Sequence, residues 1–165
     1  MQRVYSLLVD NNSGVLSRIS GLFTRRGYNI DSITAGVTAD PRFTRITIVS
    51  SGDEIILSQI EKQIAKLEDV IVVKVLKSEE SVYRELILVK IRANAQQRSE
   101  IVSIADIFRA KIVDAERESL VIELTGTQSK LEAFLQLLDG YEILELARTG
   151  IAGLSRGIKD VTFIE

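Results

Sequence analysis

The chain has 165 residues, of which 45% are apolar and 27% charged, and its formal net charge is −2. This balance is typical of a folded soluble protein with one ordinary domain or two small ones, and it argues against an intrinsically disordered chain. Cysteine and histidine are both absent. Their absence excludes disulfides and thiolate nucleophiles, and it makes most hydrolase and transition-metal mechanisms hard to build.

Membrane and nucleic-acid partners are not expected either. No apolar run approaches the roughly 20 residues of a membrane span, and residues 1–3 lead directly into a strand-like segment rather than a signal-peptide core. Nucleic-acid binders usually carry a basic stripe with interleaved aromatic residues, whereas the five Phe and four Tyr are scattered here. We therefore expect a cytoplasmic protein.

The first half of the chain predicts six elements in order. Residues 3–9 form a strand pattern, and a run of apolar residues then recurs at the spacing of one helix face: Val15, Leu16, Ile19, Leu22 and Phe23. Asn12 or Ser13 can cap this helix, and Gly27 can end it in the left-handed conformation. Strands follow at 28–37 and 43–50 around the Asp40-Pro41 turn, because β-branched residues dominate the second of them.

A second helix opens at Ser51-Gly52-Asp53 and places further apolar residues on one face: Ile56, Ile60, Ile64 and Leu67. A strand at 70–76 closes the unit. The order βαββαβ in about 75 residues is typical of a ferredoxin-like fold, in which two helices cover one face of a four-stranded antiparallel sheet.

The same order then repeats after a polar linker at 77–81. Strands are predicted at 84–92, 111–115, 120–125 and 141–147, and helices around Ile101–Phe108 and Leu131–Leu138. The fold class is therefore α+β, with two tandem ferredoxin-like domains at 1–77 and 82–165. The second includes a glycine-rich tail, 150–157.

The loop after the first strand is the strongest candidate site. Backbone N–H groups of Gly14, Val15 and Leu16 open a helix, where a small anion such as a carboxylate is stabilised. Asn11 and Asn29 are expected at facing ends of adjacent strands, and their carboxamides offer both a donor and an acceptor to a zwitterion.

Ile30 and Leu16 could supply an apolar wall for a ligand side chain at this loop. The local chemistry leaves a simpler alternative open, since Asn-Asn-Ser-Gly is also common as a capped turn that binds nothing. The corresponding loop of the second repeat, residues 93–99, has no glycine at the helix entrance. We therefore expect no amino-acid site there.

One further motif is excluded on chemical grounds. Gly153-Leu154-Ser155-Arg156-Gly157 fits the G-x-S-x-G pattern of a hydrolase nucleophile. The chain has no histidine to act as its base, and no strand-to-helix turn is predicted there. These glycines are better explained by a flexible or closely packed tail.

Several long motifs in order resemble one family, the regulatory small subunits of acetolactate synthase (acetohydroxyacid synthase). They are Asn11-x-Ser13-Gly14-Val15-Leu16-Ser17-Arg18, Gly21-Leu22-Phe23, Arg26-Gly27-Tyr28-Asn29-Ile30, Ser51-Gly52-Asp53, the strand 85–90, and 147–157. The likeness covers nearly the whole chain. Val37 stands where many relatives carry proline, which concerns a turn more than the site.

The resemblance implies an N-terminal ACT domain, which is a ferredoxin-like amino-acid sensor. Such domains form homodimers, and valine, leucine or isoleucine would bind at the interface between them. Carried over by motif, its contacts would be Asn11, Gly14, Val15, Leu16, Asn29 and Ile30. No catalytic or metal residues are expected.

The implied function is regulatory rather than catalytic. The family's thiamine diphosphate, magnesium and FAD belong to a separate large subunit, which this chain would activate and make sensitive to feedback. The alternative is a stand-alone ACT-type sensor without a synthase partner, and a small enzyme is disfavoured by the missing His and Cys.

Overall fold

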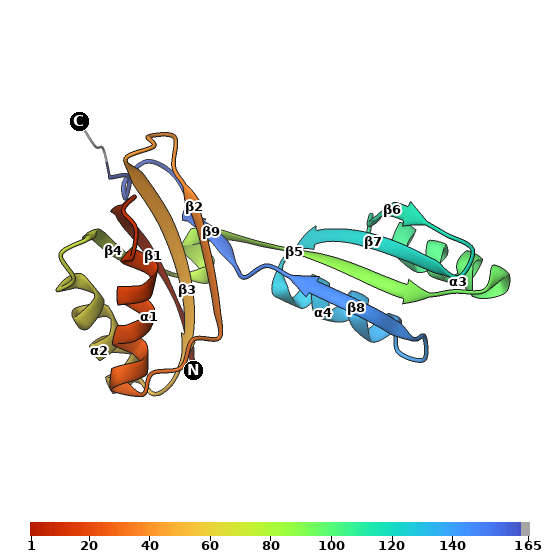
Figure 1. The fold of residues 1–165 in the computed structure, drawn as a ribbon, viewed down its shortest axis with the longest axis horizontal. Helices are drawn as coiled ribbons and strands as arrows, with labels where there is room; N and C mark the ends of the chain where they lie inside the picture. Colours follow the sequence, from red (N-terminus) through yellow and green to blue (C-terminus); the bar gives the residue numbers. More distant parts are fainter. Residues whose placement is uncertain (163–165) are drawn as a thin grey trace. The chain divides into compact units, whose positions relative to one another are not determined.

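The chain folds into two compact units, and the computed structural model describes residues 1–162. The first unit contains Met1–Tyr83 together with the tail from Gly150, and the second contains Arg84–Thr149. Figure 1 colours both along the sequence. Each unit is described by itself below.

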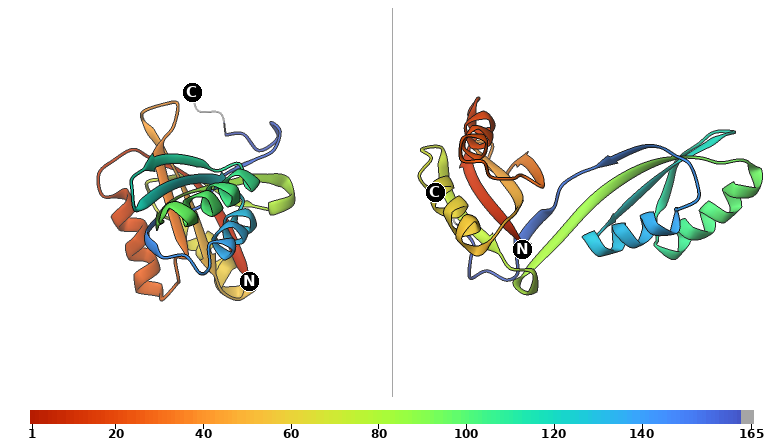
Figure 2. Two further views of the ribbon diagram at one scale, coloured as in Figure 1. Left: turned by 90° about the vertical axis from the view of Figure 1, so that its right-hand side faces the viewer. Right: turned by 90° about the horizontal axis from the view of Figure 1, so that it is seen from below.

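The first unit has the predicted order βαββαβ. Its elements are β1 (Gln2–Asp10), α1 (Val15–Arg26), β2 (Ser32–Val37), β3 (Phe43–Ser51), α2 (Glu54–Ala65) and β4 (Val70–Leu76). The strands form one antiparallel sheet in the order β2-β3-β1-β4, so β2 and β4 are its edges. Both helices cover the same face of this sheet (Figures 1 and 2).

The core of the first unit lies between the sheet and its two helices. Because side chains alternate along a strand, Tyr5, Leu7 and Val9 of β1 point to the helix side and are almost fully buried. They meet the apolar stripes of α1 and α2, whose buried members are Val15, Ile19, Leu22, Phe23, Leu57, Ile60 and Ile64. The helical spacing in the sequence predicted most of this core, but Leu16 and Ile56, which were expected on the buried faces, are 49% and 37% exposed, and Leu57 is buried instead.

The opposite face of this sheet carries the tail. A short helical turn, η1 (Ser78–Glu80), precedes β5, and the tail strand β9 (Ala152–Ser155) pairs with β5. Ile151 is buried in a small cluster with Val4, Val49 and Leu76. A Cβ at Gly150 would lie 2.7 Å from the Thr34 hydroxyl, so this position requires a residue without a side chain.

The tail therefore differs from its expected place in a domain spanning 82–165. Residues 150–162 belong to the first unit, because Ile151 completes an apolar cluster there. Residues 163–165 of that expected domain lie outside the described residues.

The second unit repeats the topology, which confirms the prediction of two ferredoxin-like folds. Its elements are β5 (Ser81–Arg92), α3 (Ala95–Ile107), β6 (Lys111–Ala115), β7 (Ser119–Gly126), α4 (Gln128–Leu137) and β8 (Ile143–Arg148). The strand order is β6-β7-β5-β8, and α3 and α4 cover one face (Figure 2). β5 begins at Ser81, at the end of the segment expected to be a linker.

One boundary differs where local signals compete. The strand predicted at 28–37 begins only at Ser32, and Tyr28 instead donates its backbone N–H to Phe23 at the end of α1. Gly27, with φ of +67°, ends α1 as predicted. Within residues 1–162, no helix is long and apolar enough to cross a membrane.

Candidate functional site

The entrance of α1 has no side-chain cap. Gly14 is the N-cap residue with φ of +84°, and no side chain accepts a hydrogen bond from the first turn. The prediction that Asn12 or Ser13 caps this helix is therefore wrong. Among the described residues, none accepts a hydrogen bond from the backbone N–H groups of Val15 or Leu16. These donors, at the positive end of the helix dipole, can bind an anion.

Gly14 has little room for a side chain. Its left-handed backbone favours glycine, and an added Cβ would lie 3.0 Å from Nη1 of Arg18. The Arg18 guanidinium therefore lies against the loop, one helical turn after Gly14. Its Nε donates to Asp69 at 2.6 Å, and this hydrogen bond raises the pKa of Arg18.

Asn11 fixes the loop to the turn between β2 and β3. Its backbone N–H donates to the carbonyl of Arg42 at 2.8 Å, and its Nδ2 donates to the carbonyl of Pro41 at 2.9 Å. Its Oδ1 accepts from the Thr44 hydroxyl at 3.1 Å. A carboxamide has two donor and two acceptor positions, so one of each is left for a ligand.

Asn29 lies at the other end of β3 from Asn11. The Ser50 hydroxyl donates to the Asn29 carbonyl, and the Asn29 Nδ2 donates to Asp31. Asn11, in contrast, is bonded to Thr44 near the start of β3. Six residues of an extended strand span about 20 Å, so the two carboxamides are far apart in one chain.

The expectation that Asn11 and Asn29 lie at facing ends of adjacent strands is therefore wrong for a single chain. It assumed that β1 and β2 are neighbours, whereas β3 lies between them and runs antiparallel to both.

The other predicted site residues also fall into two groups, one near Asn11 and one near Asn29. Val15 is buried among the helix contacts of the core, so only its backbone can reach a ligand, whereas Leu16 is 49% exposed. Ile30 is half-buried and packs against the core beside Asn29. One chain thus brings together Asn11, Gly14, Val15 and Leu16, and it holds Asn29 and Ile30 elsewhere.

Strand β2 connects these two groups along the edge of the sheet. Its first residue, Ser32, pairs with Val49, and its last, Val37, pairs with Thr44. Apolar side chains on its helix-facing side remain in solvent: Ile33 is 37% and Val37 59% exposed. The edge therefore offers unpaired backbone groups and a row of apolar side chains. A strand of another chain could pair with such an edge.

In the second unit, a side-chain cap is present at the equivalent helix entrance, the start of α3. Asn94 accepts from the N–H of Gln97 at 2.8 Å, and the Gln97 side chain accepts from the N–H of Asn94 at 3.1 Å. This reciprocal pair is a capping box. It occupies the N–H groups of Asn94 and Gln97, whereas no side chain caps the entrance of α1.

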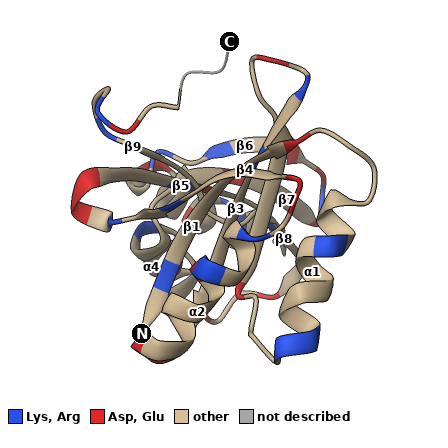
Figure 3. Ribbon diagram, turned by 90° about the vertical axis from the view of Figure 1, so that its left-hand side faces the viewer, with Lys and Arg blue, Asp and Glu red and all other residues tan. Residues whose placement is uncertain are grey.

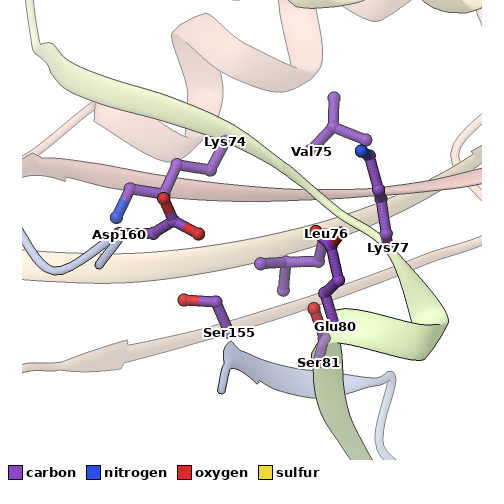
Figure 4. Close-up of a pocket in the computed structure, with 8 residues that line it drawn as sticks. All are labelled: Lys74, Val75, Leu76, Lys77, Glu80, Ser81, Ser155 and Asp160. Carbon is purple, nitrogen blue, oxygen red and sulfur yellow. The ribbon is translucent and has the colours of Figure 1, made fainter. Parts of the chain in front are cut away.

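A separate hollow of about 260 Å³ lies beside β4, η1 and the tail (Figure 4). Its charged lining consists of two lysines and two carboxylates: Lys74, Lys77, Glu80 and Asp160. It includes none of the six predicted site residues. Within residues 1–162, no three Asp or Glu side chains are grouped as a metal site would require.

Two family models match the chain. A model described as "AHAS small subunit-like ACT domain" matches residues 5–72, and one described as "Small subunit of acetolactate synthase" matches residues 84–157.

Individual relatives agree with these models. A protein of Escherichia coli named "Acetolactate synthase isozyme 3 small subunit" is 48% identical over 160 residues, which are 96% of this chain and 98% of that protein. A "Probable acetolactate synthase small subunit" of Methanothermobacter thermautotrophicus is 48% identical over 155 residues, covering 93% and 92%. The crystal structure of an acetolactate synthase small subunit from Thermotoga maritima superposes with a TM-score of 0.89 at 41% identity, covering 96% and 99%.

Proposed function

The chain belongs to the family of acetolactate synthase small subunits, and we propose that it activates a catalytic large subunit and makes it sensitive to valine or another branched-chain amino acid. The match to that family over nearly the whole length of both chains carries this proposal. The open entrance of α1 supports the sensing part, because no side chain caps its first turn, whereas a capping box covers the equivalent helix entrance of the second unit.

We propose that the effector site forms between two copies of the chain. If the β2 edges of two copies pair antiparallel about a two-fold axis, the start of one β2 lies beside the end of the other. Asn29 precedes the start, and Asn11 is bonded to Thr44 near the end. Such pairing would bring Asn29 and Ile30 of one copy to the Gly14 loop of the other.

The same pairing would bury the apolar row of β2. Ile33 and Val37 would leave solvent together with the unpaired backbone edge, and burial of apolar surface favours association. Feedback then requires that the effector bind one state of the assembly better than another, by a coupling energy of typically about 1–3 kcal/mol.

Catalysis is assigned to the large subunit. This chain has neither histidine nor cysteine for acid–base or nucleophilic chemistry. From the family resemblance, we propose that thiamine diphosphate, magnesium and FAD are bound by the large subunit.

Reconstitution tests the proposal directly. Acetolactate formation by a large subunit is measured with and without this chain, and with valine, leucine or isoleucine added. We expect the chain to raise the rate and at least one amino acid to lower it again. Binding of an amino acid without any rise in the rate would instead support the stand-alone sensor, and no response to any of the three would contradict sensing.

A mixing experiment tests the shared site. Asn11→Ala and Asn29→Ala chains are each expected to lose most effector binding. When the two are unfolded together and refolded as a mixture, mixed dimers carry one intact site and one doubly altered site. Titration calorimetry should then recover about a quarter of the wild-type sites, since half of a random mixture is mixed dimer. No recovery would place the site within one chain.

A further inference from the structure

Arg18 is held at the open end of α1 in a specific orientation. Long side chains on a helix point back toward its N-terminus, and Nη1 of Arg18 lies 3.0 Å from the position of a Cβ on Gly14. Figure 3 colours the ribbon blue at the basic residues of α1, and the helix has no acidic residue. The guanidinium therefore adds a full positive charge to an end that the helix dipole already makes positive.

Asp69 fixes only one edge of this guanidinium. Its carboxylate accepts from Nε at 2.6 Å, and it is largely buried, with 17% of its side chain exposed. Its backbone carbonyl accepts from the N–H of Asp10 at the end of β1, which anchors it beside the loop. Within residues 1–162, neither Nη1 nor Nη2 of Arg18 has a hydrogen-bond partner.

The free edge has the geometry of a carboxylate receptor. A guanidinium presents pairs of parallel N–H groups that bind both oxygens of one carboxylate. Because Asp69 already holds Nε, a ligand carboxylate would meet a side chain whose orientation is fixed in advance, which reduces the entropy lost on binding.

We propose that Arg18, oriented by Asp69, binds the carboxylate of the amino-acid effector through Nη1 and Nη2 and thereby selects free amino acids over analogues that lack a carboxylate. This inference rests on the proposed effector site and adds a residue to it. It also gives Gly14 a second role, since a side chain there would separate the guanidinium from the loop donors.

Calorimetry with valine and valinamide tests the assignment, because valinamide keeps the ammonium and side chain of valine but replaces its carboxylate by a neutral amide. We expect the wild-type protein to bind valine at least about tenfold more tightly than valinamide, as charge-assisted hydrogen bonds are the strong ones. Arg18→Gln should weaken valine binding by roughly tenfold or more and valinamide binding by less than about twofold. The preference for the carboxylate would then largely disappear.

Two further variants separate binding from structure. Arg18→Lys retains the charge but not the paired donors, so it should recover part of the preference for valine. Arg3→Gln removes a comparable ion pair, in which Nη2 of Arg3 lies 2.7 Å from Oε2 of Glu54. It should leave the affinities for valine and for valinamide unchanged. Thermal melting of each variant checks that it is folded.

An Arg18→Gln protein that melts normally and keeps the wild-type ratio of affinities would overturn the assignment. If the wild-type protein bound neither compound, the proposed effector site itself would fail.

Discussion

The entrances of α1 and α3 show how one fold treats the same position in two ways. In the second unit, residues 93–94 join strand and helix, and the Asn94–Gln97 capping box satisfies the N–H groups of Asn94 and Gln97. In the first unit, the longer loop 11–14 ends in Gly14 and provides no side-chain cap. A capped entrance stabilises its own helix, whereas an uncapped one leaves donors free for a ligand.

The uncapped loop is nevertheless firmly positioned. Asn11 uses its backbone and its carboxamide to hold the turn between β2 and β3, and Arg18 and Asp69 fix the far side of the loop. The polar groups of the first unit thus orient the loop without covering its N–H groups. This difference explains why only the first unit is proposed to sense an amino acid.

Closing the α1 entrance should have the largest effect. Gly14→Asp would place a carboxylate beside the free N–H groups and Arg18, where it would occupy the donors proposed for the effector and repel its carboxylate. We expect loss of valine binding by calorimetry and loss of inhibition in the reconstituted enzyme, while activation of the large subunit remains.

Gly27→Asp is the matched control for backbone strain. Gly27 also has positive φ, +67°, but a Cβ there meets nothing within 4 Å. Both variants should lose on the order of 1 kcal/mol of folding stability, and only Gly14→Asp should lose the response. Normal inhibition of the Gly14→Asp enzyme would show that the effector binds elsewhere.

The sequence predicted most of the fold because the apolar residues of each helix and strand recur with the spacing of that element. Apolar spacing located the four helices, and strand-like runs located β1 to β8, but strand β9 in the glycine-rich tail was not predicted. The start of β2 was predicted wrongly because a local contact competed: the Tyr28 N–H donates to the Phe23 carbonyl at the end of α1.

The candidate site was harder to predict because it depends on strand order. The motif containing Asn11 and the motif containing Asn29 are both evident in the sequence. Their separation follows from β3 inserting between β1 and β2, which no local pattern records. Asp69 was missed because it is 51 residues from Arg18. Arg18 itself could have been noticed, since residues four apart are neighbours on a helix.

Removing the cap of α3 should have a moderate effect on folding stability and no effect on valine binding. Asn94→Ala removes the acceptor for the Gln97 N–H and should lower the free energy of unfolding by about 1 kcal/mol. Urea unfolding followed by circular dichroism measures the loss. Calorimetry should find no new valine site, because the loop would still lack a glycine at the helix entrance, and Arg98, four residues after Asn94, already donates to the carbonyls of Glu116 and Arg117. A new site would mean that an open helix entrance is sufficient by itself.

The cores of the two units also differ. A substitution that removes this difference should have the smallest effect on the free energy of unfolding near neutral pH. The buried cluster of the second unit is entirely apolar, whereas that of the first includes Tyr5, whose hydroxyl donates to the Leu57 carbonyl at 2.6 Å. Tyr5→Phe should cost only about 0.5–1 kcal/mol near pH 7, since it removes one neutral hydrogen bond.

At alkaline pH, Tyr5 should make the free energy of unfolding visibly dependent on pH. Burial raises its pKa from 10.0 to about 12 in the folded protein. Because the folded state holds a proton that the unfolded chain releases, the stabilisation is complete below pH 10 and is lost as the pH rises toward 12. Urea unfolding across this range should therefore show a steeper decline in the wild-type protein than in Tyr5→Phe. Parallel declines would mean that groups shared by both proteins, rather than the buried hydroxyl of the first unit, set the alkaline limit.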